Sequence, residues 1–141
     1  VMVQLAIATT DEALETCTGV LADVAELKYD YVVDFQAPTA NNNYTWYRKY
    51  KSGWVEMGGY FDNGSAVRDK SGIQITLPVA MANIGYHYDL NAYKNDGSST
   101  GRACVASVYQ LTNSSLLVGW YGISSSDVAR YLVWKVEGMA A

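Results

Sequence analysis

The chain has 141 residues, of which 50% are apolar and 17% are charged, and its formal net charge is −4. This composition predicts one globular domain with a hydrophobic core and a short appendage, and it excludes a disordered chain. The acidic balance, with no basic cluster longer than 48–51, excludes nucleic acid as a partner, and no apolar run is long enough for membrane insertion.

The first predicted element is a short helix within residues 1–28. Residues 9–12 have the form of a capping box, with Thr9 as N-cap and Glu12 three residues later. Side chains suited to a coiled-coil seam then recur at spacings of three, four and three, at Leu14, Cys17, Leu21 and Val24. The helix either folds onto its own domain or bundles with identical helices of neighbouring chains. Because 1–8 lacks a charged n-region, we expect no signal peptide and a start within a longer protein.

From residue 29 onward the apolar period changes to two, which is typical of strands. Eight candidate strands follow, separated by turn signals: 29–35, 44–51, 54–59, 72–77, 86–93, 103–111, 115–121 and 130–137. They predict a mainly β fold, an antiparallel β-sandwich over 29–141, with 1–28 as a coiled-coil-like stalk. No helical period survives after the stalk, so a βαβ enzyme fold is not expected.

The clearest turn signal is Ser52-Gly53, which predicts a hairpin with a two-residue loop. That loop pairs Tyr50 with Val55, Lys49 with Glu56 and Arg48 with Met57. Alternation then places Trp46, Tyr50, Val55 and Met57 on one packed face, and the Lys49–Glu56 charge pair on the wet face. Arg48 falls on the packed face. It either stacks on Trp46 with its head at the rim, or pairs with a carboxylate of another chain.

Residues that carry catalytic chemistry are scarce. His87 is the single histidine, so no Ser-His-Asp or Cys-His arrangement is expected. Cys17 and Cys104 lack the spacing of a metal site and are expected to be free thiols. We therefore predict no enzyme, no cofactor and no metal site, although a carboxylate pair formed between subunits stays open.

Tyrosine is enriched, with 12 copies against 2 phenylalanines, alongside 4 tryptophans. Each tyrosine hydroxyl needs a hydrogen-bond partner or water, so these side chains cannot all lie in a dry core. Some are expected on the surface or between subunits.

Residues 44–59 resemble a pattern of distal tail-fibre proteins of phages and prophages. In that pattern an aromatic-Tyr-Arg stretch runs through Ser-Gly-Trp into Glu-x-Gly-Gly, as at 46–59 here. Asp34 on the preceding strand and the exit Leu77-Pro78-Val79 agree with it, whereas Met57 stands where the family often has Gln. Residues 73–138 are similar, more weakly, to H-type lectin-like domains, which are small trimeric β-sandwiches that bind sugars through loops at one end.

The two resemblances imply a homotrimeric tail-fibre tip of a phage or prophage, located on the virion and assembled in the host bacterial cytoplasm. Its partner would be a host cell-surface glycan or an outer-membrane protein. The alternatives are a structural module that trimerises or caps the fibre, and a depolymerase with a site between subunits.

Sugar recognition uses aromatic faces beside polar groups, so residue type and predicted loop-end position suggest a set of ligand-binding candidates. These are Tyr93, Asn95, Asp96, Arg102, Trp120 and Tyr121. For Trp120, packing in the core is the alternative.

Overall fold

The computed structural model describes residues 30–95 and 104–141. The chain divides into two units, Val1–Tyr31 and Val32–Ala141, and the second is described here. The predicted helical stalk at 1–28 lies outside the described residues and stays a prediction.

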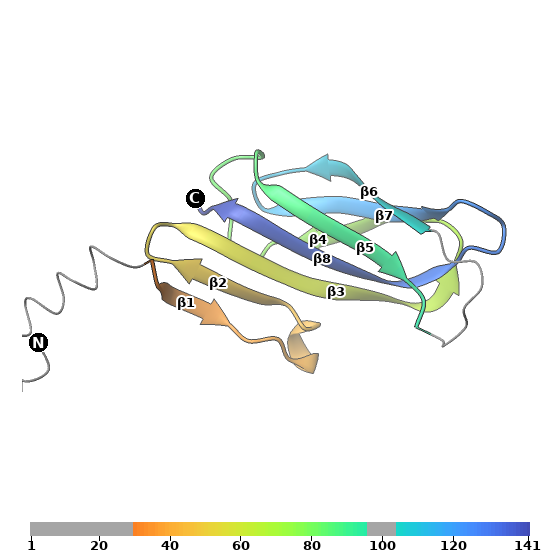
Figure 1. The fold of residues 1–141 in the computed structure, drawn as a ribbon, viewed down its shortest axis with the longest axis horizontal. Helices are drawn as coiled ribbons and strands as arrows, with labels where there is room; N and C mark the ends of the chain where they lie inside the picture. The colour runs from red at the N-terminus through yellow and green to blue at the C-terminus, as the bar shows by residue number, and fades with distance from the viewer. Residues whose placement is uncertain (1–29, 96–103) are drawn as a thin grey trace, which may run out of the picture. The chain divides into compact units, whose positions relative to one another are not determined.

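The second unit consists of two antiparallel sheets (Figure 1). The five-stranded sheet has the order β1-β2-β3-β8-β5 and the three-stranded sheet the order β4-β7-β6. The strands are β1 (Val32–Gln36), β2 (Trp46–Tyr50), β3 (Trp54–Val67), β4 (Lys70–Thr76), β5 (His87–Tyr93), β6 (Cys104–Leu111), β7 (Ser115–Gly122) and β8 (Ala129–Met139). The prediction of a mainly β fold with antiparallel sheets is confirmed.

The helical content of the described residues is a 3-10 turn, η1 (Ala40–Asn42), and none of their helices is long and apolar enough to cross a membrane. Every predicted strand is present, but β3 continues from residue 59 to Val67. Gly64, at φ 77°, lies in the irregular stretch of β3 between Asp62 and Val67, and the strand continues beyond it.

The core lies between the two sheets and follows the alternation of the strands. Buried side chains alternate along much of β7 and β8 and belong to one hydrophobic cluster. The largest contributions to this core are Trp120, Met57, Met81, Leu116, Leu132, Val55, Val118 and Val136, all below 2% exposed. Burying each such side chain stabilises the fold by about 1.5–3 kcal/mol.

The β2–β3 hairpin has a three-residue loop, so the predicted two-residue loop is wrong. The Gly53 amide donates to the Tyr50 carbonyl oxygen at 2.9 Å, and Gly53 has φ 88°. A turn followed by one left-handed glycine is the usual form of a three-residue hairpin loop. The sequence correctly predicted a loop that ends in glycine, but it missed the first residue of the loop, Lys51.

The longer loop shifts the register by one residue and exchanges the two faces of β2. Met57 is fully buried, and its partner is Tyr47, so Tyr47 lies on the inner side. Trp46 and Arg48 lie on the outer side, where Arg48 opposes Glu56. The predicted packed face is therefore confirmed for Val55 and Met57 but wrong for Trp46, Tyr50 and Arg48. The predicted pairing of Lys49 with Glu56 is wrong.

The adjacent glycines of β3 each lie beneath an indole ring. A Cβ on Gly58 would come within 2.9 Å of Nε1 of Trp46, on the outer side of the sheet. A Cβ on Gly59 would come within 2.9 Å of Cζ2 of Trp134, on the core side. The Gly-Gly of the sequence motif thus gives two indoles room to lie flat on opposite faces of one strand.

Candidate functional site

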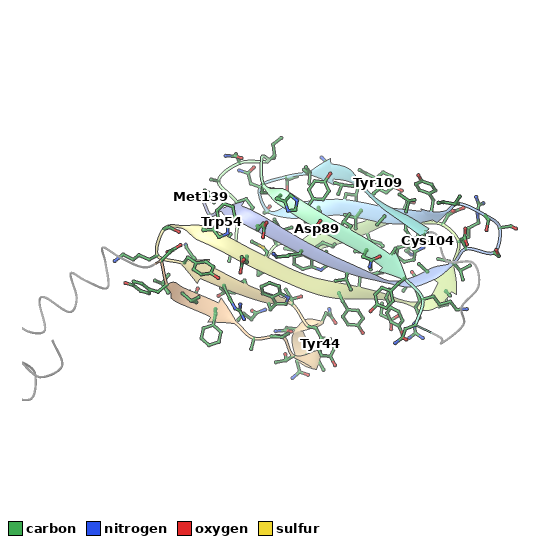
Figure 2. All side chains as sticks on the ribbon, viewed as in Figure 1. Tyr44, Trp54, Asp89, Cys104, Tyr109 and Met139 are labelled. Atoms are coloured by element: carbon green, nitrogen blue, oxygen red, sulfur yellow. The ribbon has the colours of Figure 1, made fainter. Side chains whose placement is uncertain are left out.

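Four tyrosines form a continuous row across the five-stranded sheet, which we call the tyrosine row. The ring centroids of Tyr44 and Tyr60 are 5.5 Å apart, those of Tyr60 and Tyr131 are 6.0 Å apart, and those of Tyr131 and Tyr93 are 5.3 Å apart. All three distances lie in the range of favourable aromatic pairs. The rings come from the loop before β2 and from β3, β8 and β5, and Tyr44 marks one end of the row in Figure 2.

A tightly bonded loop holds Tyr44 in place. Both Asn43 and Tyr44 adopt left-handed backbone angles, with φ 53° and 54°. This conformation costs a side-chain-bearing residue roughly 1–2 kcal/mol, so the surrounding bonds must compensate. The Tyr44 amide donates to the Thr39 carbonyl at 2.8 Å, and the Asn42 side chain donates to the Ala37 carbonyl at 3.0 Å. The strained turn points the Tyr44 ring toward Tyr60.

Arg130 contacts the middle of the tyrosine row, at Tyr131. Arg130 donates two hydrogen bonds to the carboxylate of Asp62, at 2.7 and 2.8 Å, and its guanidinium lies 4.9 Å from the ring centroid of Tyr131. The hydrogen bond from Arg130, followed by the one from the Gly64 amide, lowers the pKa of Asp62. Desolvation, and then the charge of Asp62 and the neighbouring tyrosines, raises the pKa of Tyr60, so its hydroxyl stays protonated at neutral pH.

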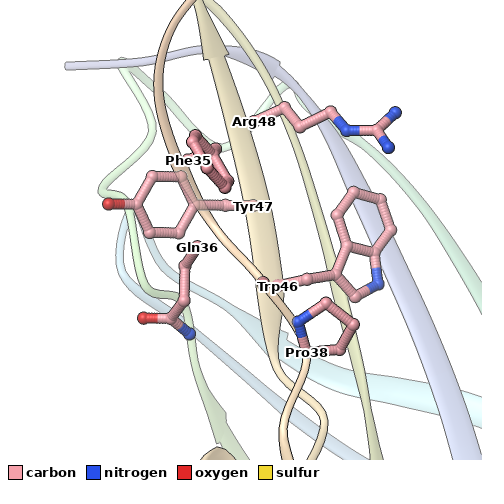
Figure 3. Close-up of a pocket in the computed structure, with 7 residues that line it drawn as sticks. Phe35, Gln36, Pro38, Trp46, Tyr47 and Arg48 are labelled. Carbon is pink, nitrogen blue, oxygen red and sulfur yellow. The ribbon is translucent and has the colours of Figure 1, made fainter.

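A groove of about 620 Å³ lies beside the row, and we call it the aromatic groove. Its lining residues are Pro38, Tyr44, Trp46, Gly59, Tyr60, Val133, Trp134 and Lys135. A second hollow of about 500 Å³ shares Pro38 and Trp46 with it and extends to Phe35 and Arg48 (Figure 3). Aromatic faces next to polar side chains can stack on a flat or ring-shaped ligand and hydrogen-bond its edge.

The predicted ligand-binding residues occupy different environments. Tyr93 is 38% exposed and ends the tyrosine row, and Asn95 is exposed just beyond it. Tyr121 is 48% exposed on the other sheet, and the ends of β5 and β7 lie at the same end of the sandwich (Figure 1). Trp120 is 1% exposed and donates from Nε1 to the Val67 carbonyl at 3.2 Å, so it packs in the core, the alternative left open by the sequence.

The remaining two candidates, Asp96 and Arg102, lie outside the described residues. Their part in binding stays a prediction, as does that of Tyr93, Asn95 and Tyr121.

Three members of the row, Tyr44, Tyr60 and Tyr131, were not among the predicted ligand-binding residues. For Tyr131 a signal existed, because the alternation of β8 places it on the outer side together with Val133. Tyr60 lay beyond the predicted end of its strand. Their proximity depends on the strand order β3-β8-β5, which joins residues about seventy positions apart, as in the pair Asp62–Tyr131.

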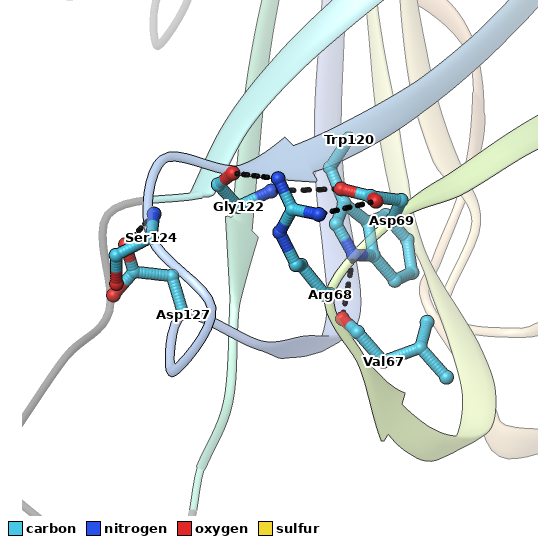
Figure 4. Close-up of polar contacts among 7 residues, drawn as sticks. All are labelled: Val67, Arg68, Asp69, Trp120, Gly122, Ser124 and Asp127. Atoms are coloured by element: carbon cyan, nitrogen blue, oxygen red, sulfur yellow. Dashed lines mark hydrogen bonds and ion pairs between the residues drawn. The ribbon is translucent and has the colours of Figure 1, made fainter.

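A polar network holds the loop that follows Tyr121 (Figure 4). The carboxylate of Asp127, 4% exposed, accepts the Ser124 amide at 2.7 Å. Asp69 accepts the Gly122 amide at 3.2 Å, and Arg68 donates to the Gly122 carbonyl at 3.3 Å. The carboxylates of Asp69 and Asp127 thus stabilise the loop by hydrogen bonds to its backbone. The described part of the chain contains no cluster of three or more His, Cys, Asp or Glu side chains suited to a metal ion.

These features define the class of the protein as an antiparallel β-sandwich with a long aromatic row on the outer face of its larger sheet. Neither a protein-family model nor a curated protein sequence matches the chain significantly.

Two solved structures of pyocin tail fibres share the fold. One is the selenomethionine structure of an N-truncated R2-type fibre, with a TM-score of 0.50 and 11% identity. The other is a C-terminal part of the R1 fibre of P. aeruginosa, with a TM-score of 0.51 and 12% identity. Each match covers 93% of this chain but only 43% and 32% of the respective fibre chain. The predicted resemblance to tail fibres is confirmed at the level of the fold.

Proposed function

We propose that this chain is the distal, receptor-binding domain of a phage or phage-like tail fibre and that it contacts the host surface through the tyrosine row. The tyrosine row is the observation that carries the proposal, because its end rings, Tyr44 and Tyr93, are 49% and 38% exposed, and large aromatic rings gain little by facing water. The fold shared with pyocin tail fibres supports it.

The receptor we favour is a host cell-surface glycan. Tyrosine presents a rigid ring with a hydroxyl at its tip and loses little conformational entropy on binding. A sugar has a face of C–H groups that can stack on such rings and hydroxyls that can bond to them. A host outer-membrane protein is the alternative partner.

We further propose that the domain works as a homotrimer at the tip of the virion's fibre, assembled in the host bacterial cytoplasm. Support comes from β1, where Val33 is 50% and Phe35 is 68% exposed, a pattern that suits burial against another copy. Because β1 and β5 are opposite edges of the sheet, contact at β1 would leave Tyr93 accessible.

The proposed function is binding without catalysis. Asp62 and Glu137, the carboxylates with lowered pKa on the outer face, each lie 2.7 Å from a cationic side chain. Both stay ionised at neutral pH, which makes them poor general acids. We therefore expect no oligosaccharide to be released when the chain is incubated with capsule or lipopolysaccharide.

The test compares Tyr60→Ala with Tyr109→Ala, a tyrosine that is 54% exposed on the other sheet and outside the row. Binding of the labelled chain to a panel of bacterial cells and to a bacterial glycan array is the measurement. We expect Tyr60→Ala to weaken binding about tenfold, as loss of a central aromatic contact of roughly 1–2 kcal/mol implies. Tyr109→Ala should bind as the unmodified chain does.

Equal binding by the two variants, with unfolding temperatures close to that of the parent chain, would remove the tyrosine row from the proposal. Failure of the unmodified chain to bind any cell or glycan would contradict the receptor-binding function itself.

A further inference from the structure

A second, smaller pocket lies at the other end of the same outer face, where β3 and β5 begin and β8 ends. Its volume is about 250 Å³. Pockets for drug-sized ligands have roughly 300–1,000 Å³, so this one suits a single small ring. It contains none of the tyrosine-row residues.

An exposed indole forms one wall of this pocket. Trp54 is the first residue of β3, is 39% exposed and pairs across the strands with Met139, which is 48% exposed. Figure 2 shows the two side chains at this end of the sheet. Trp120 and Trp134, by contrast, are buried in the core at 1% and 4% exposed. An indole face left in water next to a pocket is a surface on which a ring can stack.

Polar side chains line the same pocket. His87 pairs across the strands with Glu137, and its Nδ1 lies 3.6 Å from Oε1 of that carboxylate. Oε2 of Glu137 accepts a hydrogen bond from Lys135 at 2.7 Å. Asn83 lines the pocket as well, and its side-chain oxygen accepts the Gly85 amide at 2.7 Å, which leaves the amide nitrogen as its donor end.

The carboxylate of Glu137 is ionised at neutral pH. The hydrogen bond from Lys135 is the main cause that lowers its pKa, and the charges of Lys135 and His87 add to it. An ionised carboxylate has about four acceptor sites, so its present partners leave sites for hydroxyl donors of a ligand. Lys135 interacts electrostatically with Glu56 and Asp89 as well as with Glu137, so carboxylates outnumber this ammonium group and together repel an anionic ligand.

We propose that this pocket binds one neutral pyranose unit, which stacks its C–H face on Trp54 and donates hydroxyl hydrogen bonds to Glu137. A pyranose combines the two features that the walls require, an apolar face and a rim of hydroxyls. A uronic or sialic acid would bring a second carboxylate next to Glu137. The pocket adds a second sugar contact to the proposed receptor-binding function, and its biological purpose rests on that function. The assignment of a neutral pyranose as its ligand rests on the geometry of the pocket itself.

The test uses saturation-transfer NMR on the purified 141-residue chain with methyl glycosides of gluco, galacto and manno configuration, and with methyl glucuronide as the anionic counterpart. We expect at least one neutral glycoside to bind with a dissociation constant on the order of 1–10 mM, as suits a single ring. The glucuronide should give a signal at least several-fold weaker.

Three variants locate the binding. Trp54→Ala should abolish the signal, Trp54→Phe should retain most of it because a ring is kept, and Glu137→Gln should weaken it several-fold and reduce the preference over glucuronide. Tyr109→Ala, on the other sheet and outside both this pocket and the tyrosine row, is the matched control and should leave the signal unchanged.

The proposal is overturned if no neutral glycoside binds, if Trp54→Ala binds as the parent does, or if glucuronide binds as well as the neutral sugars. The two proposals fail separately. Cell binding that depends on Tyr60 without any glycoside signal at Trp54 would refute this pocket alone, whereas a Trp54-dependent signal without cell binding would refute only the receptor-binding function.

Discussion

At the scale of single residues, the two adjacent glycines of β3 show how a short motif sets the packing on both sides of a sheet. Gly58 lies beneath Trp46 on the outer side, and Gly59 lies beneath Trp134 on the core side. A side chain at either position would lift an indole from the sheet. The outer glycine therefore shapes the aromatic groove, and the inner one shapes the core.

We predict that Gly59→Ala destabilises the fold by about 1–3 kcal/mol, because the new methyl group meets the ring of Trp134 in a packed core. Trp134→Phe removes the ring atoms that the methyl group would meet. The double variant should thus be less destabilised than the sum of the two single variants by at least about 0.5 kcal/mol. Urea unfolding measures all three, and strictly additive effects would refute the contact.

At the scale of elements, the ion pair of Arg130 with Asp62 ties β3 to the start of β8. It lies next to the irregular stretch of β3 between Asp62 and Val67, where the regular pairing with β8 is interrupted. A bulge weakens the ladder locally, so a bidentate bond at this point restores the attachment. The same bond positions Arg130 against Tyr131, so it also supports the tyrosine row.

This ion pair predicts a dependence of stability on pH. The pKa of Asp62 is lower in the folded chain than in the unfolded chain, so the stabilisation is present above about pH 4 and is lost as the pH falls through the folded-state pKa. Asp62→Asn should lower the unfolding temperature at pH 7, and the difference from the parent should shrink at acidic pH. Arg130→Gln should behave in the same way. A difference that does not depend on pH would contradict the role of the carboxylate charge.

At the scale of the whole molecule, the two sheets differ in width, and the wider one projects beyond the core. Among the described residues the buried core draws on β3, β5 and β8 of that sheet and on β4 and β7 of the other, and β1 supplies no member. All residues of β1 except Gln36 are exposed. Val33 and Phe35 are exposed on this edge strand, and an exposed edge strand is a typical site of pairing with another chain.

We expect light scattering to give a mass near three chains for the unmodified protein, in keeping with the proposed homotrimer. Phe35→Ser should shift the mass toward a single chain on dilution, because Phe35 is the most exposed large apolar side chain in the described residues. Tyr109→Ser, on the outer side of the other sheet, is the control and should leave the mass unchanged. A monomeric parent chain would contradict the trimer.

Local signals predicted the strands well because alternation and turn residues are properties of neighbouring positions. They failed at the hairpin, since Ser52-Gly53 is compatible with a two-residue and a three-residue loop. Both loops bury Val55 and Met57, and they differ in which side chains of β2 face the core. Packing of Tyr47 against the core selects the three-residue loop. The candidate site was predicted only in part. The position of Tyr93 at a strand end indicated a binding residue, but no local signal indicated that the rings of Tyr131, Tyr60 and Tyr44 lie beside it.

The amino-acid sequence is therefore sufficient to predict the class of the fold, the positions of its strands and an excess of tyrosine that one core cannot hold. Three features follow from the folded structure and not from local sequence: Trp46 lies on the outer face, Trp120 is buried, and four tyrosines form one row, Tyr44, Tyr60, Tyr131 and Tyr93. The physical reason is that strand order and register are set by contacts between residues far apart in the chain. A one-residue change in register moves every side chain of a strand to the other face.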